Sequence, residues 1–146
     1  MSTPKANKTA IKTALDTISG LTVDTIRGPG DEIPGDKLPL VTITTREITS
    51  EPSAHVRGSA QDFYRTQTLQ LDLYVKYSAT KELEEQLDDT TASIEAAIMA
   101  TDDLADTVHN LFMQSVIYEK EDTGGVPLAH AEIEIIVEYT HTAALV

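Results

Sequence analysis

The chain has 146 residues, the size of one domain, and its 40% of hydrophobic residues can form a core without covalent staples. The absence of cysteine excludes disulfides, thiolate metal sites and cysteine nucleophiles. Acidic and basic residues are equal in number up to residue 76, whereas Lys81 and Lys120 are the only basic residues beyond it. Residues 77–146 therefore carry the whole net charge of −13 and are not expected to bind nucleic acid.

The apolar runs of the sequence are short. None approaches the roughly 20 residues that cross a bilayer. The polar start, Met1-Ser2-Thr3-Pro4-Lys5, lacks the apolar centre of a signal peptide. We therefore expect a protein that makes no membrane contact and is synthesised in a cytoplasm.

The first predicted element is a helix. Ile11, Ala14, Leu15 and Ile18 recur at helical spacing, which predicts one buried face. We expect the helix to begin within residues 3–7 and to end before Gly20, which suits a left-handed C-cap.

Two strands and a loop are predicted next. The apolar run at residues 21–26 indicates a short strand, and residues 27–36 hold three glycines and two prolines, which favour a loop. Residues 38–48 are rich in β-branched side chains, which are typical of a strand.

Residues 49–62 are predicted to be a long loop. They contain Ser50, Pro52 and Gly58 but no apolar periodicity, and so long an irregular segment in a small domain indicates function or disorder. We interpret the segment as a long β-hairpin arm with a mobile tip. A disordered linker is the alternative.

The segment that follows changes its period abruptly. Within residues 63–77, Leu69, Leu71 and Leu73 alternate with polar residues, which predicts a strand with one dry and one wet face. Residues 80–100 then show helical spacing, and Ser78 or Thr80 is suited to cap this second helix.

The C-terminal part is predicted to form a hairpin. Residues 104–115 fit either a short helix or a strand, whereas residues 116–121 indicate a strand and residues 122–125 a turn. Residues 131–139 alternate strongly, with Ile136 as the exception, and residues 140–146 are expected to be a tail.

These elements predict a single α+β domain across residues 1–146. Its mainly antiparallel sheet carries two helices packed on one face, and a long hairpin loop extends from it.

Catalytic and metal-binding patterns are weak in this sequence. His130-Ala131-Glu132 places two possible ligands on one strand face, but such triplets are common by chance, and we predict no catalytic residue, no metal site and no cofactor. Tyr and Arg are favoured at protein interfaces, and the loop-flanking region contains the candidates. The predicted interface residues are Arg46, His55, Arg57, Phe63, Tyr64 and Arg65.

Four features in this order carry a family resemblance. A first helix ends at residues 18–20, strand 38–43 precedes a long segment, strand 69–75 runs into helix 83–98, and strand 133–139 closes the chain. In this architecture, over nearly its whole length, the chain resembles the tail-terminator or tail-completion proteins of long-tailed bacteriophages, of the minor tail protein U group.

The resemblance implies a non-enzymatic structural protein of the virion, at the head-proximal end of the tail. Such proteins form rings, commonly hexamers, that cap the tail tube, stop polymerisation of the major tail tube protein and offer a joining surface to the head-side connector. DNA passes through the ring without specific binding. The alternatives are a head-completion or neck connector protein, a tail-tube subunit, a small acidic protein that regulates a basic partner, and an enzyme.

Overall fold

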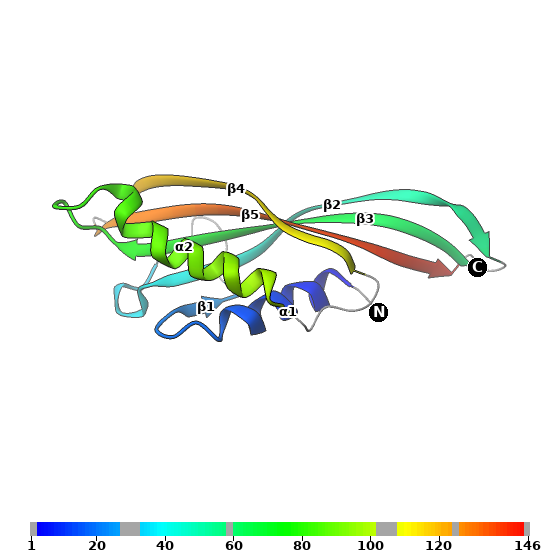
Figure 1. The fold of residues 1–146 in the computed structure, drawn as a ribbon, viewed down its shortest axis with the longest axis horizontal. Coiled ribbons are helices and arrows are strands. Elements are labelled where there is room, and N and C mark those ends of the chain that lie inside the picture. The colour runs from blue at the N-terminus through cyan, green and yellow to red at the C-terminus, as the bar shows by residue number, and fades with distance from the viewer. Residues whose placement is uncertain (1–2, 27–32, 58–59, 102–107, 124–125, 145–146) are drawn as a thin grey trace.

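The computed structural model describes residues 3–26, 33–57, 60–101, 108–123 and 126–144. A five-stranded sheet has the order β1-β2-β3-β5-β4, from β1 (Thr22–Asp24), β2 (Leu40–Arg57), β3 (Ala60–Lys76), β4 (Val108–Thr123) and β5 (Val126–Ala144). Only β1 and β2 pair in parallel; the other neighbours are antiparallel. The helices α1 (Pro4–Leu15) and α2 (Leu83–Met99) both lie on one face of the sheet (Figure 1). The predicted α+β class is confirmed.

Helix α1 begins as the sequence predicts and ends earlier. The Thr3 hydroxyl accepts a hydrogen bond from the backbone N–H of Ala6 at 3.0 Å, which caps the first turn. The helix stops at Leu15 with Asp16 as its C-cap, so the predicted end near Ile18 is wrong. Gly20 does take a left-handed φ of 80°, but in the turn that follows the helix.

Helix α2 begins three residues later than predicted, and neither Ser78 nor Thr80 caps it. Glu82 is the N-cap residue and makes no side-chain capping bond. The two predicted capping hydroxyls bond each other instead. The Gln86 side chain accepts a hydrogen bond from the backbone N–H of Ser78 and donates one to its carbonyl, so Gln86 fixes the connection between β3 and α2.

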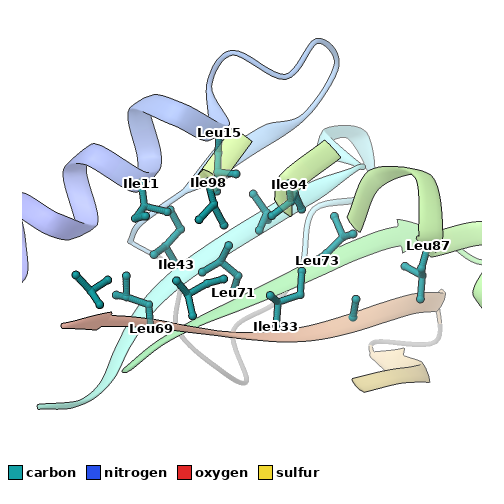
Figure 2. Close-up of a cluster of buried hydrophobic side chains, with 14 of the residues drawn as sticks. Ile11, Leu15, Ile43, Leu69, Leu71, Leu73, Leu87, Ile94, Ile98 and Ile133 are labelled. Atoms are coloured by element: carbon teal, nitrogen blue, oxygen red, sulfur yellow. The ribbon is translucent and has the colours of Figure 1, made fainter. Parts of the chain in front are cut away.

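The core lies between the helices and the sheet, as Figure 2 shows. Leu69, Leu71 and Leu73 of β3 are fully buried on this face, in one cluster with Ile11 and Leu15 of α1. The remaining buried members of this cluster are Val41, Ile43, Leu87, Ile94, Ile98, Ala129, Ala131, Ile133, Ile135, Val137 and Tyr139. The alternation predicted for β3 and β5 is therefore correct on the core side.

Two predicted irregular segments are strands. Residues 49–57 continue β2 and pair with β3, and residues 140–144 continue β5 and pair with residues 60–64 of β3. Backbone hydrogen bonds form these ladders whatever the side chains, so the polar composition hid them. The hairpin interpretation of the first segment is confirmed, whereas its tip at residues 58–59 lies outside the described residues.

The ambiguous segment before residue 116 resolves as a strand from Val108, while residues 102–107 lie outside the described part of the chain. Of the predicted loop at 27–36, only residues 33–36 are described, and a 3₁₀ turn forms at Gly35–Lys37. Within the described ranges, no helix is long and apolar enough to span a membrane.

Candidate functional site

Part of the sheet extends beyond the helices. Strands β2, β3 and β5 continue past α1, to the right in the view of Figure 1. We call residues 48–57, 60–66 and 140–144 the arm. Residues 46–52 of β2 are all exposed, and Ile48 and Tyr64 are 41% and 58% exposed. Among the side chains that the structure describes, the arm thus offers those of Ile48 and Tyr64 to solvent, and no described helix covers it.

The start of the arm is marked by buried polar residues. The Asn7 amide of α1 donates to the Gln67 side chain at 3.1 Å, and both residues are buried. Gln67 in turn donates to the Pro4 carbonyl and to the Thr45 hydroxyl. The N-terminus of α1 is therefore attached to β3 where the apolar core ends and the arm begins.

The predicted interface residues do not form one cluster. Strand alternation places Phe63 and Arg65 on one face and Tyr64 on the other. Arg65 donates to the Ser50 hydroxyl across the β2–β3 pair at 3.0 Å. His55 and Arg57 lie in the outer part of β2, and their side chains are outside the described set.

A hollow lies at the base of the arm. Tyr64 meets the His109 ring edge-on with their centroids 6.4 Å apart, and His109 is hydrogen-bonded to the Thr140 hydroxyl. The hollow has a volume of about 270 Å³, and its walls are Tyr64, Arg65, Thr66, His109, Glu138 and Tyr139. Tyr64 is therefore the predicted interface residue that combines high exposure with an adjacent concave surface.

The sheet has open strand edges on opposite sides. β1 pairs only with Leu40–Thr42, so no described strand covers the outer edge of β2 from Thr44 onward. β4 is the last strand on the other side, and its Val116 and Ile117 are 36% and 53% exposed. Unpaired backbone groups along such edges are templates for pairing with another chain.

The sheet face opposite the helices, which we call the uncovered face, is rich in carboxylates. Arg46, at a bulge of β2, lies on this face with its guanidinium 3.9 Å from Glu132 and 3.7 Å from Glu134 of β5. By strand register, Lys76 and Arg57 are further cations on this face, although the side chain of Arg57 is outside the described set. By the same register, the described carboxylates of this face are Glu47, Glu51, Asp62, Asp72, Glu119, Glu121, Glu132, Glu134 and Glu138.

One end of the uncovered face is not wet, contrary to the prediction. His130 of β5 is buried between carboxylates of both neighbouring strands. Its Nε2 lies 2.8 Å from Oδ1 of Asp72, and its Nδ1 lies 2.8 Å from Oε1 of Glu119 and 3.3 Å from Oε2 of Glu121. We call these four residues the His130 cluster. Asp72 is also buried, and it accepts hydrogen bonds from Gln70.

The ring of Tyr74 fixes the plane of the His130 ring. The two rings are stacked with centroids 4.7 Å apart and planes 6° from parallel. Burial alone lowers the pKa of His130, but its hydrogen bonds to Asp72 and Glu119 outweigh that effect and raise the pKa above its usual value. Burial also raises the pKa of Tyr74, and the charge of Asp72 adds to the rise.

This cluster does not follow from the local sequence, which pairs His130 with Glu132 instead of with its true neighbours. Glu132 is on the same strand face, but its carboxylate is beside Arg46. The true neighbours come from β3 and β4, and their approach depends on a register that no local pattern reveals. The spacing of Glu119 and Glu121, two residues apart on a strand, was the available signal.

Sequence comparisons found no matching protein-family model and no curated protein with significant similarity to the chain.

Proposed function

We propose that this chain is a non-enzymatic structural protein of a bacteriophage tail that forms a ring on the tail tube. The ring, a hexamer in our proposal, ends polymerisation of the major tail tube protein and joins the tail to the head-side connector. The arm carries the proposal, since it combines exposed Ile48 and Tyr64 with an uncovered β2 edge. A ribbon of this kind suits contact with another protein better than it suits catalysis.

The strand directions support closure of a ring. β2 and β4 run in opposite directions, because three successive antiparallel pairs separate them in the sheet. If copies are rotated about an axis along the strands, the β4 edge of one copy meets the β2 edge of the next in antiparallel orientation. Such a head-to-tail contact continues the sheet, and it closes into a ring when the rotation closes.

The uncovered face supports a channel that DNA can pass. Its described carboxylates outnumber Arg46, Arg57 and Lys76, and both Glu132 and Glu134 remain partly exposed. A channel wall of this charge repels phosphates, so DNA in contact with it is not held. In our proposal, the uncovered face therefore points toward the ring axis.

A polymerisation assay tests the proposal. The tail tube protein from the same genome is polymerised with and without the purified chain, and the products are viewed by electron microscopy. We expect tubes of limited length with one extra ring at an end. Unchanged tube length with no added ring contradicts capping, and long cylinders of the chain alone identify a tail-tube subunit instead.

A deletion of residues 52–60 sharpens this assay. It leaves Gln61, Asp62 and Phe63 as a short connection between Glu51 and Tyr64, which already pair in the sheet. We expect the deletion to abolish capping, whereas Met99→Ser, at an exposed site at the end of α2, caps normally. Normal capping by the deletion variant would show that the tip of the arm is not needed for capping.

A further inference from the structure

We propose that Glu119, Glu121 and His130 form a binding site for a divalent transition-metal ion of the Zn²⁺ class. Nδ1 of His130 and one carboxylate oxygen from each glutamate all lie within 4.8 Å of one another. This inference is independent of ring formation, and none of these three residues belongs to the arm.

The geometry of the three ligand atoms fits one ion. In a tetrahedral zinc site with bonds of about 2.0–2.1 Å, neighbouring ligand atoms are about 3.3 Å apart. Oε2 of Glu121 already lies 3.3 Å from Nδ1 of His130. Oε1 of Glu119 lies at 2.8 Å, so this exposed side chain has only to move outward slightly to admit the ion.

An unpartnered oxygen points into the same place. Oε2 of Glu121 is shielded from solvent and has no hydrogen-bond partner, although it is within ion-pair distance of Nδ1. Glu119 takes the hydrogen bond that Nδ1 can give. A buried carboxylate oxygen without a hydrogen bond is costly, and a cation at this point would satisfy it.

The surroundings of His130 orient it as a metal ligand. The imidazole side chain is only 7% exposed, and its second nitrogen faces the Asp72 carboxylate at 2.8 Å. A histidine that donates its Nε2–H to a carboxylate presents Nδ1 to a metal, an arrangement that recurs in metal sites, and the ion takes the place of the Nδ1 proton, which is released to solvent. The stacked Tyr74 ring prevents the imidazole from turning away.

The ligand set selects the class of ion. One imidazole nitrogen and two carboxylate oxygens suit Zn²⁺, Co²⁺ or Mn²⁺, whereas Ca²⁺ and Mg²⁺ prefer oxygen ligands alone. Glu119 and Glu121 are 52% and 38% exposed at their side chains, so the site opens to solvent on their side. Water can enter there and complete the coordination.

Calorimetric titration of Zn²⁺ into the chelator-treated full chain, without an affinity tag, tests the site. We expect one ion per chain, with Glu119→Gln and Glu121→Gln each lowering the association constant at least about 10-fold. The matched control is Glu132→Gln, which removes a carboxylate of the same face beside Arg46 and should change the constant less than about twofold. Far-UV circular dichroism establishes that each variant is folded.

Nuclear magnetic resonance of the unmodified chain keeps the test decisive if a variant fails to fold. Zn²⁺ should move the His130 Nδ1 resonance while the Nε2 proton is retained. Two results overturn the proposal: the absence of saturable binding by Zn²⁺, Co²⁺ and Mn²⁺, or binding that leaves the His130 ring resonances and both glutamine variants unaffected.

Discussion

Strands β2, β3 and β5 pass through two regions of the sheet, the helix-covered region and the arm, which differ in the interactions that stabilise them. In the helix-covered region, Leu69, Leu71 and Leu73 of β3 are fully buried against the helices. In the arm, the same strand carries exposed Tyr64, and residues 48–52 of the neighbouring β2 are all exposed. The first region is stabilised by apolar burial and the second mainly by its backbone ladder, so we expect stability to depend on one and assembly on the other.

The largest effect on stability is expected in the covered region. Leu71→Ala removes a fully buried side chain of a central strand and should lower the free energy of unfolding by about 2–5 kcal/mol. Thr49→Ala, on an exposed site of the arm, should change it by less than about 0.5 kcal/mol. Denaturant unfolding followed by circular dichroism measures both. Equal losses for the two variants would contradict the division.

A smaller effect is expected at the boundary between the regions. Gln67→Ala leaves the buried Asn7 amide without its side-chain acceptor and should cost about 1–3 kcal/mol. The same unfolding measurement applies, with Gln61→Ala as a comparison on the arm side of β3. A cost below that of Gln61→Ala would show that the polar attachment of α1 is dispensable.

The sequence predicts the covered region much better than the arm. The core positions of β3 and β5 follow from alternation, because successive side chains in the covered region point in turn toward the helices and toward the opposite face. Residues 49–57 and 140–144 show no such alternation, because no described helix covers either face of the arm, and their polar composition resembled a loop and a tail. Their strand character comes from pairing with β3, which is a long-range property.

The His130 cluster was hidden for the same reason. His130 stands directly opposite Glu119 in β4 and Tyr74 in β3, and both pairings depend on register. The prediction that this face of β3 is solvent-exposed is wrong at Asp72, which is buried against side chains from these neighbouring strands. A local pattern reports which face a residue takes, but not which residues of other strands share that face.

The N-cap of α1 allows a finer test of the covered region. Thr3→Ala removes the hydroxyl that accepts from the Ala6 N–H and should cost about 1 kcal/mol. Thr3→Ser keeps an acceptor at this position and should restore most of the loss. Thermal unfolding compares the three proteins. Equal midpoints for the alanine variant and the wild-type chain would show that the cap does not contribute to stability.

The smallest effect on stability is expected at Tyr64. Tyr64→Ser should change the free energy of unfolding by less than about 0.5 kcal/mol, because the side chain is 58% exposed. The same change should weaken self-assembly, since Tyr64 borders the hollow at the base of the arm. Unfolding and sedimentation of one sample measure the two properties together. A large stability loss with normal assembly would reverse the roles given to the two regions.

Sedimentation velocity across a wide range of protein concentrations tests whether the arm builds a closed ring, as we propose. We expect one assembled species of fixed mass whose population grows with concentration, and we expect this species to be lost when residues 52–60 are deleted. A chain that remains monomeric at every concentration, or a deletion variant that assembles like the intact protein, would contradict the proposal.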